Sequence, residues 1–183
     1  FVCLLWPCST GARQYFFGSY TVDDGLLSED VRCIARDRRG FLWVGTEGGL
    51  SRFDGTDFTS YKGLSADSNG LPSNNILLLF VDSDDRLWVA SWRGVVRYNR
   101  SGNTFKQITF QGRPVDFACY SILEDAQKKI WVTTAGKGLL RYNAQSGSME
   151  DPFPGAAGDS LRKGQIIMKL VADIDGTLWG IGF

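Results

Sequence analysis

Trp92 and its polar neighbours are the residues of this sequence whose types best suit the binding of a ligand. The flat apolar face of an indole can stack on the C–H side of a pyranose ring. Arg93 follows Trp92 directly, and Asn74 and Asn75 could supply hydrogen bonds beside it. The alternative is that Trp92 packs against the neighbouring unit of the fold, and the residue types favour that alternative.

Several kinds of catalytic and metal chemistry are excluded or disfavoured by the composition. The 183 residues include no His, which removes His general bases, Ser-His-Asp triads and most zinc sites. The cysteines Cys3, Cys8, Cys33 and Cys119 match no metal motif, and the last two are interpreted as buried free thiols in strands. We therefore expect no catalytic residue, no metal and no cofactor in this chain.

A calcium loop is also disfavoured, although two Asp-rich segments begin like one. Such a loop needs an oxygen ligand at position five and a carboxylate at position twelve. Counted from Asp82, these positions hold Arg86 and Arg93. The segments from Asp82 and Asp173 are therefore interpreted as turns.

The elements that must position these residues follow from a pattern that recurs four times. The copies begin at Asp37 (DRRGFLWVGTEGGLSRFD), Asp82 (DSDDRLWVASWRGVVRYN), Asp125 (DAQKKIWVTTAGKGLLRYN) and Asp173 (DIDGTLWGIGF). In each copy the Asp precedes a Trp by six residues, which gives the pairs Asp37/Trp43, Asp82/Trp88, Asp125/Trp131 and Asp173/Trp179. The steps from one Trp to the next are 45, 43 and 48 residues. A repeat of this length is one unit that cannot bury its own faces alone.

Each copy is predicted to form one small antiparallel sheet. In the first copy, strands are expected at 31–36, 41–46, 50–54 and 58–61, because apolar residues alternate with a period near two. Four short strands joined by tight turns are the size of a β-propeller blade. The predicted fold class is all-β, a partial β-propeller with about three and a half four-stranded antiparallel blades.

Aliphatic and arginine side chains recur in register with this pattern. Branched aliphatic residues stand three positions before each Asp and are expected to pack between blades: Ile34, Leu79, Ile122 and Leu170. The R-[FY]-[DN] segment supplies Arg52, Arg97 and Arg141. We expect these guanidinium groups to bond carbonyls or an Asp between blades rather than to bind a ligand. Together with the four Asp/Trp pairs, they are interpreted as structural residues of the repeat.

Three charged residues occupy equivalent loops of successive blades, namely Glu47, Arg93 and Lys137. These loops would lie on one rim of the propeller, and loops on a rigid scaffold often carry binding residues. The alternative is a solvated surface, which three unlike charges favour.

The predicted organisation runs from a leader to an incomplete fourth blade. Residues 1–14 are interpreted as the remnant of a signal peptide or leader, because an apolar run precedes small residues. Residues 15–22 are predicted to be a ring-closing strand. Blades are expected at 30–62, 75–110 and 117–150, followed by an incomplete blade at 165–183. The long loop 146–164 is a further candidate for ligand binding.

The combination of Asp24-Gly-Leu-Leu-Ser with D-x-x-G-x-L-W-V-G-T-x-x-G-L-x-R-[FY]-[DN] resembles the two-component regulator propeller repeat. The resemblance covers residues 15–183. It implies the N-terminal sensor region of a bacterial hybrid two-component system sensor histidine kinase, in the periplasm as the extracytoplasmic part of an inner-membrane protein. It also implies a seven-bladed ring.

The same resemblance implies partners and activity. The ligand would be an oligosaccharide or other glycan, and the propeller would contact downstream propeller and immunoglobulin-like domains of the same chain. The full-length protein would be a histidine kinase and a homodimer, whereas this segment would transmit a signal without being an enzyme. The formal net charge of zero gives no case for nucleic-acid binding.

Two alternatives remain open at this point. One is a propeller lyase of the streptogramin-inactivating or polysaccharide type, whose catalytic residues would lie outside this segment. The other is an interaction scaffold like a WD40 protein, although the Gly-His and Trp-Asp signatures of that family are missing.

Overall fold

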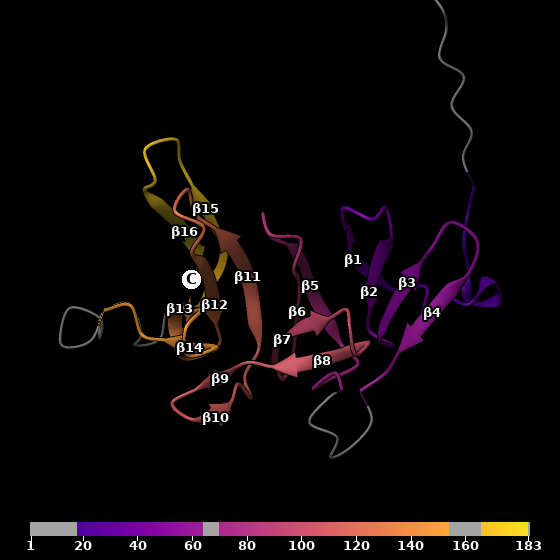
Figure 1. Cartoon of the computed structure of the whole chain (residues 1–183), viewed down its shortest axis with the longest axis horizontal. Coiled ribbons are helices and arrows are strands. Elements are labelled where there is room, and N and C mark those ends of the chain that lie inside the picture. Colours follow the sequence, from indigo (N-terminus) through magenta and orange to yellow (C-terminus); the bar gives the residue numbers. More distant parts are fainter. Residues whose placement is uncertain (1–17, 64–69, 154–165, 183) are drawn as a thin grey trace, which may run out of the picture.

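The computed structural model describes residues 18–63, 70–153 and 166–182, which form four antiparallel sheets arranged one after another around an arc (Figure 1). The innermost strands of successive sheets pack beside one another. The predicted fold class, an all-β partial β-propeller, is confirmed. The predicted leader at 1–14, Cys3 and Cys8, residues 15–17 of the predicted closing strand and much of the loop 146–164 lie outside the described residues.

Apart from two added strands in the third sheet, the strands of each sheet follow one another in chain order, joined by short turns. Blade 1 contains β1 (Val31–Arg36), β2 (Leu42–Thr46), β3 (Leu50–Phe53) and β4 (Phe58–Tyr61). Blade 2 contains β5 (Ile76–Val81), β6 (Leu87–Ser91), β7 (Gly94–Asn99) and β8 (Thr104–Gln107). Blade 3 contains β11 (Cys119–Glu124), β12 (Ile130–Thr134), β13 (Gly138–Asn143) and β14 (Ser148–Glu150). The fourth sheet contains β15 (Ile167–Ala172) and β16 (Leu178–Gly182).

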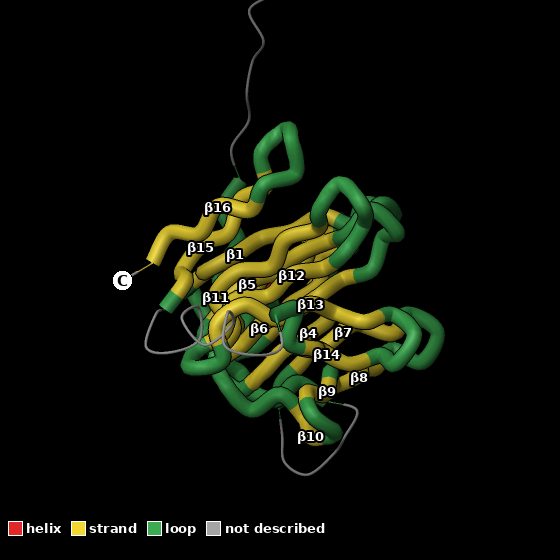
Figure 2. The backbone as a smooth tube through the Cα atoms, turned by 90° about the vertical axis from the view of Figure 1, so that its left-hand side faces the viewer, coloured by secondary structure: helices red, strands yellow, loops and turns green. Residues whose placement is uncertain are grey.

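The third sheet has two further strands, which correct the predicted end of blade 2 at residue 110. β9 (Thr109–Phe110) pairs in parallel with β14 and antiparallel with β10 (Arg113–Pro114). The chain crosses between blades at Ile108, which is buried and donates its backbone N–H to Val95. The short β9–β10 hairpin, at the lower end of the tube in Figure 2, therefore covers the outer edge of blade 3.

The described part of the predicted closing strand at 15–22 is not extended into a strand. Val22–Asp24 form a short 3-10 helix, η1, and the Thr21 side chain caps it together with Asp24. Tyr20 instead packs its ring on Phe53 and Phe58 of blade 1, at centroid distances of 4.9 and 5.6 Å. The capping interaction and this aromatic contact give the segment local partners in place of a strand ladder. No helix in the described part of the chain has the length and apolar character needed to cross a bilayer.

An Asp side chain holds the first turn of every sheet. One carboxylate oxygen accepts the backbone N–H groups two and four residues later, and the other accepts the indole N–H of the Trp. The Trp Nε1–Asp Oδ2 distances are 3.1, 2.8, 2.7 and 2.9 Å in chain order. The residue three after each Asp has a positive φ, which glycine adopts most readily: Gly40 (93°), Asp85 (61°), Lys128 (61°) and Gly176 (81°). The D-x-x-G-x-L-W spacing is thus one hydrogen-bonded turn.

The first two repeated Trp side chains fill the space between blades. Trp43 and Trp88 have no exposed surface, and each meets a Tyr of the next blade edge to face, Tyr98 at 4.7 Å and Tyr142 at 4.8 Å. The repeated arginine joins the same contact, because Arg52 Nη1 lies 3.3 Å from the Tyr98 hydroxyl. Arg97 and Tyr142 repeat this distance at the next interface. Two of the three repeated arginines thus lie between blades, where they bond a Tyr hydroxyl instead of the expected carbonyl or Asp.

Trp131 and Trp179 depart from this arrangement, although the repeat pattern treats all four Trp residues alike. Trp131 is only 8% exposed, but the fourth sheet, over residues 166–182, contains no Tyr to meet its ring. The Arg141 guanidinium lies 5.8 Å from the Trp131 ring centroid and pairs with Glu150 of its own blade. Trp179 is 62% exposed. Among the described residues, Trp131 and Trp179 thus keep the Asp bond of the repeat but have no ring contact with a Tyr of a next blade. The bond expected between blades at Arg141 is wrong, because Arg141 pairs within blade 3.

The aliphatic positions predicted to pack between blades divide into two groups. Leu79, Ile122 and Leu170 are buried as predicted. Ile34 is 63% exposed, which contradicts the prediction for the first blade. It lies on the face of blade 1 that points away from blade 2, and no described sheet covers this part of that face.

The two described cysteines are free thiols, and we expect them to resist alkylation in the folded protein. Burial raises the pKa of the Cys33 thiol to about 11 and that of Cys119 to about 12. At pH 8 both are therefore protonated, and the thiolate is the reactive form. Peptide mass spectrometry after iodoacetamide treatment should find both unmodified in buffer and both modified in denaturant. Modification of Cys119 in buffer at the denatured rate would contradict this.

Candidate functional site

Each sheet has one edge that carries its first turn, the turn bonded by the repeated Asp, which we call the Asp turn. The candidate site lies at the other edge of the sheets. Antiparallel strands reverse direction at each turn, so the β2–β3 and β6–β7 turns and the segments that enter β5 and β11 share one edge. The Asp turns β1–β2 and β15–β16 lie at the opposite edge, toward the top of Figure 1. The topology thus collects residues from three blades on a single rim.

Arg32 is the centre of this rim. Its Nη1 donates to Asn75 Oδ1 at 3.1 Å, and its Nη2 lies 3.6 Å from Glu47 Oε2. Its Nε lies 3.9 Å from a carboxylate oxygen of Asp30. The backbone N–H of Trp92 in turn donates to the Asn75 carbonyl at 3.3 Å. The structure therefore brings together Glu47 and Asn75 with Trp92, three of the predicted site residues.

Trp92 presents its side chain at this rim. It is 51% exposed, so the burial that the residue types favoured is only partial. Arg93, the next residue, pairs with Asp116 at 3.1 Å, and both side chains are about two-thirds exposed. An ion pair as exposed as this contributes little stability, so the Arg93 guanidinium is free to exchange partners.

Asn74 and Lys137, which were also predicted to bind the ligand, lie outside the group of side chains around Arg32. The Asn74 side chain accepts the backbone N–H of Gly63 at 2.6 Å, so it ties together the two ends of the segment between blades 1 and 2. Lys137 lies in the β12–β13 turn of the next blade and is exposed, and no described carboxylate pairs with it. Among the described residues, neither side chain forms a hydrogen bond or ion pair with Arg32, Glu47 or Trp92.

Sequence reasoning missed Arg32, Asp30 and Asp116. A signal was available for Arg32, because it stands in an inner strand at the position that holds Leu77 and Tyr120 in the next two blades. A charged residue where the other copies are apolar marks a place where the blade does more than pack.

The rim can offer stacking and hydrogen bonds. The exposed indole stands on a turn whose backbone bonds Asn75, and the side-chain amide of Asn75 accepts from Arg32. This combination suits a hydroxylated ligand with an apolar ring face. No group of three or more Cys, Asp or Glu residues within 18–63, 70–153 and 166–182 is placed to hold a metal ion.

Comparison with known proteins identifies the repeat. Residues 25–48 and 70–93 match the two-component regulator propeller family. The chain contains two-component regulator propeller repeats. In each matched propeller repeat the segment runs from the inter-blade loop to the turn after the Trp strand. It therefore includes Arg32 and Glu47 in the first repeat, and Asn75 and Trp92 in the second.

The relatives of these propeller repeats are larger proteins. A 58-residue stretch is 41% identical to histidine kinase P4 of Formosa agariphila and spans 32% of this chain and 4% of that protein. The extracellular domain of one hybrid two-component system from B. thetaiotaomicron is similar with a TM-score of 0.75 and 24% identity, over 89% of this chain and 23% of that one. A second such domain gives a TM-score of 0.68 and 24% identity, over 84% and 20%.

Propellers with other activities share the shape. Virginiamycin B lyase from Staphylococcus aureus is similar with a TM-score of 0.60 and 20% identity, over 85% of this chain and 50% of the lyase. At such identity the likeness concerns the fold alone.

Proposed function

We propose that this chain belongs to the extracytoplasmic, periplasmic sensor region of a hybrid two-component regulator. In that role it binds a glycan-derived ligand and helps to transmit the signal to a histidine kinase in the same polypeptide. The observation that carries the proposal is the match of two successive repeats to the regulator propeller family. The local identity to a histidine kinase also supports it.

The gene is the first test of this proposal. We expect the gene that encodes this chain also to encode further propeller repeats, an immunoglobulin-like domain, a membrane-spanning helix and a histidine kinase. A gene with neither a membrane helix nor a kinase would overturn the sensor role. A compact His, Tyr and Glu site in other blades would then favour the lyase alternative.

The rim around Arg32 and Trp92 is the proposed ligand site. The Trp92 indole would stack on the apolar face of a sugar ring, and Asn75 with Arg32 would bond its hydroxyl groups. In membrane preparations that contain the full-length protein, the level of phosphorylation of that protein should change when the cognate oligosaccharide is added. A kinase whose activity no oligosaccharide pool alters would contradict signal transmission by glycan binding.

Replacing Trp92 by alanine is expected to weaken oligosaccharide binding about tenfold, since about 1.4 kcal/mol of stacking corresponds to that factor. Trp92→Phe keeps an aromatic face and should lose less. Isothermal titration with oligosaccharide pools would measure both affinities, with Lys137→Gln as a control on the same rim outside the cluster. Equal affinity of Trp92→Ala and the unaltered protein would place the ligand elsewhere.

A further inference from the structure

The arginine of each repeat has a different residue directly opposite it on the neighbouring strand. Arg52 faces Thr59 in blade 1, Arg97 faces Lys106 in blade 2, and Arg141 faces Glu150 in blade 3. In blade 3 the carboxylate of Glu150 accepts from Arg141 Nε at 3.0 Å. In blade 1 the Thr59 hydroxyl lies 3.5 Å from Arg52 Nη2. Blade 2 alone among these three places a second cation opposite the arginine.

Like charges directly opposite each other destabilise a strand pair unless an anion lies between them. The nearby carboxylates are already paired with other cations. Arg86 bonds Asp82 at 2.6 Å, and Arg100 lies 2.9 Å from Asp85. Within the described ranges no carboxylate lies within ion-pair distance of Arg97 or Lys106.

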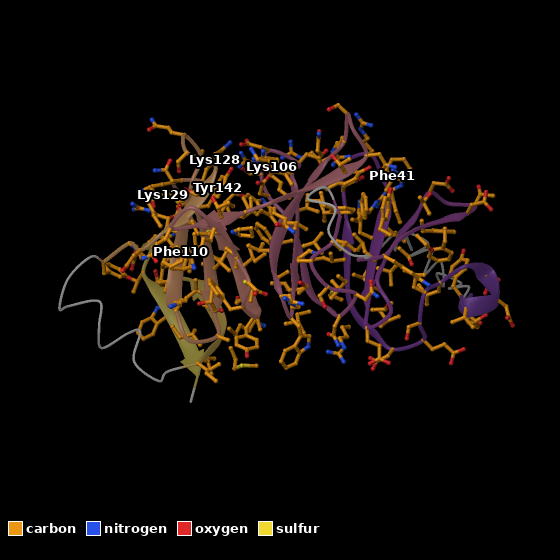
Figure 3. All side chains as sticks on the ribbon, turned by 90° about the horizontal axis from the view of Figure 1, so that it is seen from below. Phe41, Lys106, Phe110, Lys128, Lys129 and Tyr142 are labelled. Atoms are coloured by element: carbon orange, nitrogen blue, oxygen red, sulfur yellow. The ribbon has the colours of Figure 1, made fainter. Side chains whose placement is uncertain are left out.

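These two cations line an open pocket of about 610 Å³ at the Asp-turn edge of blade 2. Asn99 and Ser101 line it as well, together with Asp84, Asp85, Arg86 and Arg100, whose charges pair with one another. The hydroxyl of Tyr142 reaches toward the same place from blade 3, because it lies 3.3 Å from Arg97 Nη1. Figure 3 shows Lys106 and Tyr142 close together.

The Lys106 side chain spans from blade 2 to blade 3. A Cβ atom built on Gly147, in the turn before β14, would lie 3.7 Å from Lys106 Nζ and 3.9 Å from the Tyr142 hydroxyl. The ammonium group and the phenol therefore approach one point. A guanidinium, an ammonium and a hydroxyl converge between two blades.

We propose that this pocket is a binding site for an oxyanion: a carboxylate, sulfate or phosphate group. Arg97 would hold the oxyanion with its guanidinium N–H groups, as Arg141 holds the Glu150 carboxylate, and Lys106 would pair with its charge from the opposite strand. The hydroxyl of Tyr142 would donate a further hydrogen bond. The site lies at the edge opposite Trp92, so it is independent of the proposed sugar site.

Isothermal titration of the full chain at constant ionic strength tests this site. The probes are sodium sulfate, sodium phosphate, glucuronate and uncharged glucose. We expect the oxyanions to bind and glucose not to bind. Preference for sulfate or phosphate would identify a free inorganic anion as the ligand, and preference for glucuronate would identify an acidic group on a larger molecule. The proposal is overturned if none of the three oxyanions binds.

Variants at one position separate the site from general charge effects. Lys106→Glu recreates the blade 3 pair and should abolish oxyanion binding, with a loss of at least about tenfold. Lys106→Thr recreates the blade 1 pair and should weaken binding less, which keeps the test valid if the first variant fails to fold. Lys129→Glu makes the same charge change outside the pocket and should leave binding unchanged. Equal weakening by Lys106→Glu and Lys129→Glu would overturn the proposal.

Discussion

Replacing Trp88 by alanine is expected to lower the free energy of unfolding by about 3–5 kcal/mol, the range for a large aromatic side chain removed from a core. The indole has no exposed surface and meets the Tyr142 ring at 4.8 Å, so its removal leaves a cavity between blades 2 and 3. It also removes the donor that lies 2.8 Å from the Asp82 carboxylate, which is itself buried. A loss of this size is a large part of the stability of an ordinary domain.

Urea denaturation followed by circular dichroism would measure this loss, and Trp179→Ala is the matched control. Trp179 makes the same bond to its own Asp, at 2.9 Å, but is 62% exposed. Its replacement should cost no more than about 1 kcal/mol, because an exposed side chain leaves no cavity. If the two substitutions lowered stability equally, the repeated Trp would act through its turn alone and not through packing between blades.

The sequence was sufficient to predict the blades because each repeat encodes its own local structure. The Asp that precedes each Trp by six residues bonds three donors of one turn, so a short stretch of chain determines its conformation. Ile34 shows where this reasoning fails. It occupies the same position of the repeat as Leu79 and Ile122, which are buried against the preceding blade, but no described sheet covers Ile34 in this way. Trp131 shows the same limit, since it keeps its Asp bond but has no Tyr of a next blade to meet it within 166–182. Packing between blades depends on a partner that the local pattern does not contain.

The candidate sites were predicted less completely because they depend on pairs that are distant in the sequence. Arg32 and Asn75 are 43 residues apart and meet only when two blades pack. The opposition of Arg97 and Lys106 requires the register of two strands, which the turn at 100–103 sets. The residues that depart from the repeat, such as Trp92, Arg32 and Lys106, are nevertheless visible once the copies are aligned. These departures coincide with both proposed binding sites.

The Gly94→Ala substitution is expected to be at least as damaging as the loss of Trp88. Gly94 begins β7 with φ at 124°, a conformation that side chains rarely adopt. A Cβ atom at this position would lie 2.1 Å from the carbonyl oxygen of Val115, in the segment that leads into blade 3. Relief of this clash requires the backbones of two blades to separate, so we expect a loss above about 4 kcal/mol or failure to fold.

Gly112→Ala measures the cost of placing a side chain at a positive φ without the steric clash that Gly94→Ala would also cause. Gly112 also has a positive φ, 76°, but nothing lies within 4 Å of the Cβ that would be added. Its replacement should therefore cost only about 1–2 kcal/mol, the penalty for a left-handed conformation. The difference between the two variants in chemical denaturation measures how closely blades 2 and 3 are packed at this edge. Equal losses would mean that the contact between Gly94 and Val115 yields easily, and that the blades are joined mainly through their Trp and Tyr side chains.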